Sequence, residues 1–109
     1  MYNVQSCYNI LLCYCEKGWN SWNKFGCDVS ETLIKETIDA IVNLGLDKFG
    51  YNYVNVDDCW QAQERDSNGQ VVADPTRFPN GMKYLAEYAH SKGIMCLICV
   101  QHLIISDAF

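Results

Sequence analysis

Hydrophobic residues recur at helical spacing in two stretches of the chain. In the first stretch the recurrence follows i, i+4, i+7 and i+8 and involves Ile34, Ile38, Ile41 and Val42. This pattern predicts an amphipathic helix. Asp28 or Ser30 can cap its N-terminus, Asp28 and Glu31 stand at capping-box spacing, and Gly45 ends it. The second stretch predicts a helix that ends at Gly93, with an apolar face formed by Met82, Leu85, Ala86 and Ala89.

Short runs of apolar, aromatic and β-branched residues predict strands at residues 10–14, 51–56 and 94–100. Between the predicted elements lie a glycine-bounded aromatic loop at residues 18–26 and a long polar connection at residues 57–80, with a turn at residues 66–69. The order strand, helix, strand, helix, strand is typical of the α/β class with a parallel sheet and right-handed crossovers. Because ligands of such sheets meet the loops after the carboxyl ends of the strands, these two loops are candidates for a site.

The composition narrows the class of protein. The chain has 109 residues, of which 50% are hydrophobic and 19% charged, so it can form a buried core and is not a disordered tail. Thirteen acidic residues against eight basic ones disfavour nucleic acid as a partner. No apolar run approaches the roughly 20 residues that span a bilayer. With no repeats or linkers, residues 1–109 are expected to form one structural unit.

Two adjacent carboxylates follow the predicted second strand. Asp57 and Asp58 form either a solvated turn or part of a site, beside Trp60, which could offer an apolar wall. Adjacent strand residues point to opposite faces, so the pair is poorly placed to flank one glycosidic bond from two sides. The carboxylates suit the acceptance of hydrogen bonds from sugar hydroxyls better.

Two tryptophans lie in the first loop, three residues apart. Trp19 and Trp22 are either packing aromatics or faces on which a sugar ring stacks, and we expect at least one of them to pack.

Cysteine is abundant, with seven residues, which favours an oxidising compartment: Cys7, Cys13, Cys15, Cys27, Cys59, Cys96 and Cys99. Cys27 and Cys59 each follow one of the two candidate loops and are either bridged or free and buried. A zinc site at the remaining close pairs is disfavoured, because residues 13–15 and 96–99 are apolar and strand-like. We therefore expect buried thiols and no metal.

Three segments together resemble the N-terminal part of the retaining α-galactosidases and α-N-acetylgalactosaminidases: GWNSW (18–22), DDCW (57–60) and RDSNG…ADPTRFPNGMKYLAEYAHSKG (65–93). The resemblance implies an eight-stranded (β/α) catalytic barrel followed by a β-sandwich, and cleavage of terminal α-linked galactose by double displacement without a cofactor. It implies that Trp22 lines the sugar site, that Asp57 and Asp58 bind galactose hydroxyls and that Cys27 pairs with Cys59. It also implies α-galactosyl glycans or glycolipids as substrates, a lysosomal or secreted location and, often, homodimers.

The chain also departs from the family pattern, at residues 1–17 and 94–109. Cys15-Glu16-Lys17 replaces the usual lead into the Trp loop, Cys99 stands where the family has a sugar-binding Tyr, and no convincing signal peptide precedes the strand at residues 10–14. In the family the nucleophilic and acid/base Asp residues lie on later strands. We therefore expect about the first three strands and two crossover helices of a barrel, with no catalytic residue and no activity alone. The alternative is a non-catalytic galactose-binding or regulatory fragment.

Overall fold

A parallel three-stranded sheet forms the centre of the computed structural model, which describes residues 18–98. The strands β1 (Gly18–Asn20), β2 (Tyr53–Val56) and β3 (Met95–Ile98) lie side by side in chain order. In their register Gly18 stands opposite Tyr53, and Tyr53 stands opposite Met95. The parallel sheet and the strand-helix-strand alternation from β1 to β3 are thereby confirmed.

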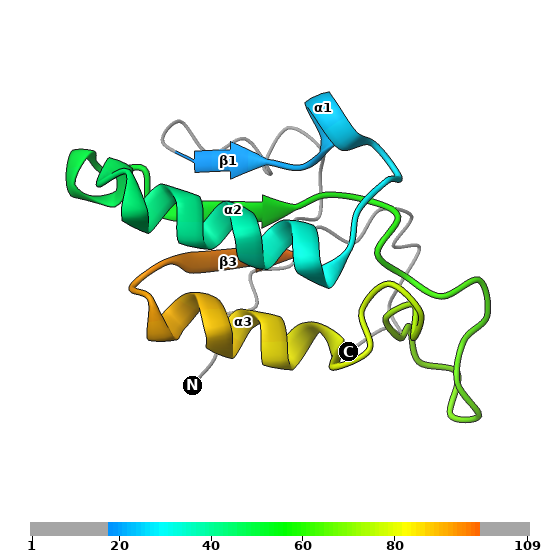
Figure 1. The fold of residues 1–109 in the computed structure, drawn as a ribbon. Coiled ribbons are helices and arrows are strands. Elements are labelled where there is room, and N and C mark those ends of the chain that lie inside the picture. Colours follow the sequence, from blue (N-terminus) through cyan, green and yellow to red (C-terminus); the bar gives the residue numbers. More distant parts are fainter. Residues whose placement is uncertain (1–17, 99–109) are drawn as a thin grey trace.

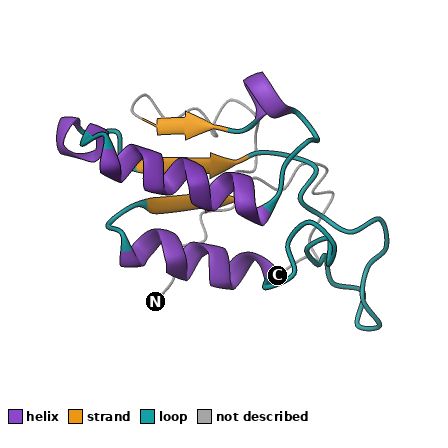
Figure 2. Cartoon of the chain, viewed as in Figure 1, coloured by secondary structure: helices purple, strands orange, loops and turns teal. Residues whose placement is uncertain are grey.

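Two longer helices, α2 (Glu31–Asn43) and α3 (Gly81–Ser91), cover the same face of the sheet (Figures 1 and 2). Helix α2 begins as predicted, since the Ser30 Oγ accepts a hydrogen bond from the Leu33 amide at 3.2 Å. The predicted capping box is wrong. Glu31 turns instead to the start of α3, where its carboxylate accepts two hydrogen bonds from Asn80, from the backbone N–H at 3.2 Å and from Nδ2 at 3.0 Å.

The core lies between these helices and the sheet. The apolar faces read from the sequence point into it: Ile34, Ile38, Leu85 and Ala89 are fully buried, and so are Val54 and Val56 of β2. Met82 and Val42 are half-buried at its margin. Burying these side chains supplies most of the stability that holds the helices on the sheet.

The first described strand lies where the sequence predicted a loop. Residues 18–20 pair with β2, and the short helix α1 (Trp22–Phe25) follows at once. A three-residue strand bounded by glycine carries no periodicity, and its pairing with β2 alone defines it. The strand predicted at residues 10–14 lies outside the described residues.

The other two strands are shorter than predicted. The segment before β2 is occupied by the 3-10 helix η2 (Leu46–Phe49), which ends at Gly50 with a φ of 91°. The Tyr51 amide donates back to the Leu46 carbonyl at 3.2 Å and so belongs to the turn after η2, and β2 begins at Tyr53. The predicted third strand begins at Met95, and its residues beyond Ile98 lie outside the described part of the chain.

The connection at residues 57–80 folds back on itself as a small antiparallel excursion from the carboxyl edge of the sheet (Figure 1). The Ala62 amide donates to the Val72 carbonyl, and the Asp74 amide donates to the Trp60 carbonyl, both at 2.9 Å. The predicted turn at its tip is confirmed, because the Asp66 carboxylate accepts hydrogen bonds from the amides of Asn68 and Gln70. The excursion therefore has defined structure of its own.

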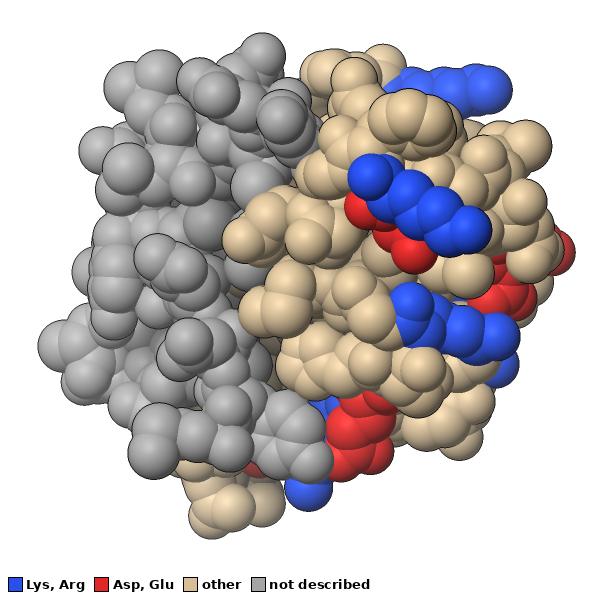
Figure 3. All heavy atoms as spheres, turned by 90° about the vertical axis from the view of Figure 1, so that its left-hand side faces the viewer, with Lys and Arg blue, Asp and Glu red and all other residues tan. Residues whose placement is uncertain are grey.

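Acidic and basic side chains stand next to one another on the face seen in Figure 3, without a continuous basic area on its described part. Lys92 Nζ forms an ion pair with Asp39 Oδ1 at 3.6 Å. No helix among residues 18–98 is long and apolar enough to cross a membrane.

Candidate functional site

The carboxyl ends of β1 and β2 bring the predicted site residues to one edge of the sheet. Trp22 opens α1 directly after β1, and Asp57 and Asp58 follow β2. The two chain segments stay paired beyond the strands, since the Ser21 amide donates to the Asn55 carbonyl at 3.1 Å. The parallel register therefore brings residues 22 and 57, which are 35 positions apart in the sequence, to the same edge of the sheet.

Asp57 is held on both of its carboxylate oxygens. Oδ2 accepts a hydrogen bond from Asn20 Nδ2 at 3.0 Å, and Oδ1 accepts one from the Asp58 amide at 2.8 Å. The Asp57 amide in turn donates to Ser21 Oγ at 3.0 Å, and Ser21 is fully buried. A carboxylate oxygen can accept two hydrogen bonds, so each oxygen keeps capacity for a ligand while its direction is fixed.

Asp58 differs from its neighbour in its contacts. It is half-buried, and within residues 18–98 its carboxylate accepts no hydrogen bond and forms no ion pair. A carboxylate that follows the carboxyl end of a strand and has unused acceptor positions can accept hydrogen bonds from a polar ligand such as a sugar.

The two tryptophans of the first loop have different environments. Trp19 packs against the core and lies 6.0 Å from the Phe25 ring, which confirms the expectation that at least one of them packs. Trp22 is 46% exposed, and its backbone amide donates to Asn20 Oδ1 at 2.8 Å. The exposed indole of Trp22 is available for stacking. Trp60, expected to offer an apolar wall, is 4% exposed and belongs to the core.

A disulfide joins the two site loops, between Cys27 after α1 and Cys59 beside Asp58, with Cα atoms 5.0 Å apart. Cys59 has a φ of 72°, a left-handed backbone that non-glycine residues adopt at a cost, so the bridge holds the chain in a sharp bend between Asp58 and Trp60. The bridged alternative for this pair is therefore correct.

The remaining described cysteine has no chemical role at this site. Cys96 is buried, and burial raises the pKa of its thiol to about 12, which makes the thiol unreactive. Cys7, Cys13, Cys15 and Cys99 lie outside the described residues. In the described part of the chain no group of three or more His, Cys, Asp and Glu residues could hold a metal ion.

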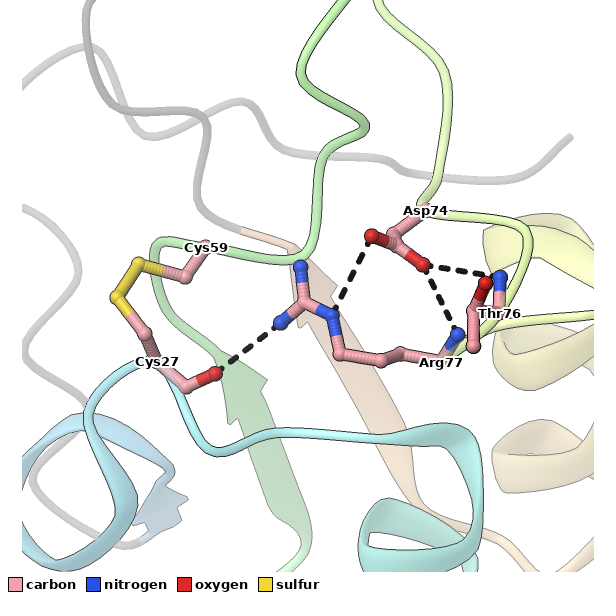
Figure 4. A network of polar contacts seen from close by, with 5 residues as sticks. All are labelled: Cys27, Cys59, Asp74, Thr76 and Arg77. Carbon is pink, nitrogen blue, oxygen red and sulfur yellow. Dashed lines mark hydrogen bonds and ion pairs between the residues drawn. A yellow bond between two sulfur atoms is a disulfide. The ribbon is translucent and has the colours of Figure 1, made fainter.

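A network of polar contacts connects Asp74 and Arg77 to the disulfide loop at Cys27 (Figure 4). Arg77 Nη1 donates to the Cys27 carbonyl at 3.1 Å, and Arg77 Nε lies 3.5 Å from Asp74 Oδ2. The Asp74 Oδ1 accepts hydrogen bonds from the amides of Thr76 and Arg77. The backbone N–H of Arg77, helped by that of Thr76 and by the guanidinium charge, lowers the pKa of Asp74. This network fastens the excursion to the disulfide loop.

Sequence reasoning missed two residues of the site, Asn20 and Ser21. Both are hydrogen-bonded to Asp57, through a side-chain amide and a hydroxyl. Their position in the sequence was the signal that could have identified them, because these two polar residues stand between Trp19 and Trp22 in the first loop.

These observations place the chain in the class of α/β proteins whose site lies at the carboxyl ends of parallel strands. The family model described as alpha galactosidase A matches residues 15–102. The chain therefore belongs to the α-galactosidase family.

Individual relatives agree with this assignment. Alpha-galactosidase 3 of Arabidopsis thaliana is 57% identical over 79 residues, which are 72% of this chain and 18% of that protein. The solved structure of α-galactosidase I from Mortierella vinacea superposes with a TM-score of 0.73 at 47% identity, over 84% of this chain and 23% of that one. The solved structure of the α-galactosidase of Saccharomyces cerevisiae with raffinose also superposes with a TM-score of 0.73. Its sequence identity is 44%, and the match covers 87% of this chain and 21% of that one. The chain thus spans about a fifth of the length of the curated relatives it matches.

Proposed function

We propose that this chain supplies the galactose-recognising part of an α-galactosidase that removes terminal α-linked galactose from glycans or glycolipids. One observation carries the proposal: Trp22, Asp57 and Asp58 gather at the carboxyl edge of the sheet in a chain of this family. The Saccharomyces relative was solved with raffinose. The bridge between Cys27 and Cys59 supports a lysosomal or secreted location, because disulfides persist in oxidising compartments.

Each proposed residue has a separate task. Asp58 accepts hydrogen bonds from galactose hydroxyls with its unengaged carboxylate, and Asp57 uses the acceptor capacity that its two protein bonds leave. The exposed Trp22 indole stacks on the apolar face of the sugar. Together they orient the galactose unit before any bond is cleaved.

Cleavage needs other carboxylates. A retaining glycosidase uses a nucleophile and an acid/base group about 5–5.5 Å apart, one on each side of the glycosidic bond. Asp57 and Asp58 are chain neighbours at the end of one strand, so they are poorly placed to flank one glycosidic bond from two sides, and we assign both to sugar binding. We therefore propose that the chain corresponds to about the first three strands of a (β/α)8 barrel and does not hydrolyse galactosides alone.

Two measurements on the purified polypeptide test this function. With p-nitrophenyl α-galactoside we expect no hydrolysis above the buffer rate. In an NMR titration with galactose we expect saturable binding with a Kd of about 1 mM or weaker, roughly −4 kcal/mol, because few loops contact the sugar. Asp58→Ala is expected to abolish this binding, while Asp28→Ala, at an exposed position after the first site loop, leaves it unchanged. Hydrolysis by the polypeptide, or equal binding by the two variants, would contradict the proposal.

A non-catalytic galactose-binding role is the second candidate, favoured by the fact that one series of hydrogen bonds, through Asn20, joins the three proposed binding residues. A stand-alone binder must hold its ligand without the remaining loops of a barrel. A Kd of roughly 10 µM or tighter, about −7 kcal/mol, would favour this role over the first.

A further inference from the structure

Asn20, the last residue of β1, uses both ends of its side-chain amide at the site. Its Nδ2 donates to Asp57 Oδ2 at 3.0 Å, and its Oδ1 accepts from the Trp22 amide at 2.8 Å. Its partners lie on both site loops, one of them 37 residues away in the sequence. Asn20 is therefore the side chain through which the first loop contacts the carboxylate of the second.

The bonds of Asn20 continue into the rest of the site. Asp57 Oδ1 accepts from the Asp58 amide at 2.8 Å, so one unbroken series of hydrogen bonds runs from Trp22 through Asn20 and Asp57 to Asp58. All three proposed sugar-binding residues belong to this series, and Asn20 is the member that joins Trp22 to Asp57. Ser21 also joins the two segments, but its Oγ accepts from the backbone N–H of Asp57 and does not orient the Asp57 carboxylate.

The chemistry of this position requires both a donor and an acceptor. An aspartate at position 20 could still accept from the Trp22 amide, but it would place a second negative charge beside Asp57 and offer no donor. An alanine would offer neither. Without the Asn20 donor, the bond that the Asp57 carboxylate keeps within residues 18–98 is that from the adjacent Asp58 amide, about which it can rotate.

We propose that Asn20 is a positioning residue for galactose, which fixes the direction of the Asp57 carboxylate and the entry of Trp22 into α1. The role rests on the proposed function, because it presumes that this edge binds galactose. Asn20 contributes by pre-organisation: the bound geometry exists before the sugar arrives, so binding loses less conformational entropy.

The test is an NMR titration of the purified polypeptide with galactose near pH 7, where carboxylates are ionised. We expect Asn20→Ala to weaken binding about tenfold, in line with the loss of charge-assisted hydrogen bonding. Asn20→Asp is expected to weaken it further through charge repulsion. Asn23→Ala is the matched control, since this exposed asparagine lies within α1, and it should bind as the native chain does.

The amide signals separate positioning from a merely structural role. Asn20→Ala should shift the amide resonances of both Trp22 and Asp58, whereas Asn20→Asp should leave the Trp22 amide hydrogen-bonded and shift that of Asp58. If Asn20→Ala does not fold, Asn20→Asp carries the test, because it keeps the bond that starts α1.

Two results would overturn the inference, and they are distinguishable. If the native chain binds galactose and the folded Asn20 variants bind equally well, with an unmoved Asp58 amide, Asn20 has no positioning role. If the native chain shows no galactose binding at any concentration, the proposed function fails and the role of Asn20 fails with it.

Discussion

Cys59 combines two constraints in one residue, a disulfide to Cys27 and a left-handed φ of 72°. The bend it makes turns the chain from the half-buried Asp58 to the buried Trp60. In an extended chain without this bend, the side chains of Asp58 and Trp60, two residues apart, would point to the same face. Site geometry and core packing are thus coupled at a single backbone position.

Removing the bridge is expected to destabilise the fold substantially. The bridge spans a sequence separation of 32 residues. By the chain-entropy model its loss in Cys27→Ser/Cys59→Ser lowers the free energy of unfolding by about 3–4 kcal/mol. Cys27→Ser/Cys59→Gly should recover roughly 1 kcal/mol of this, because glycine adopts the left-handed backbone without penalty. Urea unfolding measures both, and equal stability of the two variants would show that the backbone at position 59 carries no cost.

Asp74 is expected to make stability depend on pH. The pKa of its carboxyl is lowered below the ordinary value of an aspartate, first by the hydrogen bond from the Arg77 amide, so the folded state binds the proton less tightly than the unfolded state. The resulting stabilisation is present above the unfolded pKa and is lost as pH falls through the folded one. Asp74→Asn should therefore be less stable than the native chain at neutral pH, and the difference should shrink in acid. Urea unfolding at several pH values checks this, and a constant difference would contradict it.

The two longer helices, α2 and α3, were predictable from the sequence because their information is local. The aliphatic stripe of α2, its Ser30 cap and the face of α3 that carries Leu85 all follow from spacing within one element. β1 could not be predicted in this way. Its residues Gly18–Asn20 are a strand only because β2 stands beside them, and a single-segment pattern contains no trace of that partner.

The two helices are joined at their N-termini by Glu31, which is 8% exposed and accepts both hydrogen bonds from Asn80. Glu31→Gln puts an amide NH2 where one of these donors needs an acceptor, and it removes a negative charge from the first turn of α2. We expect a loss of about 1–2 kcal/mol in the free energy of unfolding.

Glu36→Gln provides the control for this prediction, because Glu36 lies on the exposed side of α2. It should change stability by less than about 0.5 kcal/mol. Chemical denaturation followed by circular dichroism compares the two variants. If they unfold alike, the contact between Glu31 and Asn80 does not fasten the helices together.

Across the whole molecule, the candidate site was only partly predictable. Asp57, Asp58 and Trp22 were found because they follow strands or loops in a recognisable order. The contribution of Asn20 depends on a contact across 37 residues, between the ends of two parallel strands, and no local pattern specifies which polar residue makes it. The brace from Arg77 to the Cys27 carbonyl, across 50 residues, was missed for the same reason.

Packing of the helices on one face of the sheet makes the whole described fold depend on a small core. Leu85 of α3 is fully buried in the same core cluster as Ile38 of α2 and Val54 of β2, so this side chain belongs to the core that α2, α3 and the sheet share. Leu85→Ala leaves a cavity that the rigid neighbours fill only in part, at a cost of about 2–5 kcal/mol. Since a shift of 1 kcal/mol moves the Tm of a small domain by about 4–8 °C, we expect the Tm to fall by roughly 10 °C or more. Lys83→Ala, at a side chain 79% exposed on the same helix, should leave the Tm nearly unchanged. Thermal unfolding followed by circular dichroism measures the Tm of both variants. Equal Tm values for Leu85→Ala and Lys83→Ala would mean that α3 contributes little to the stability of the sheet.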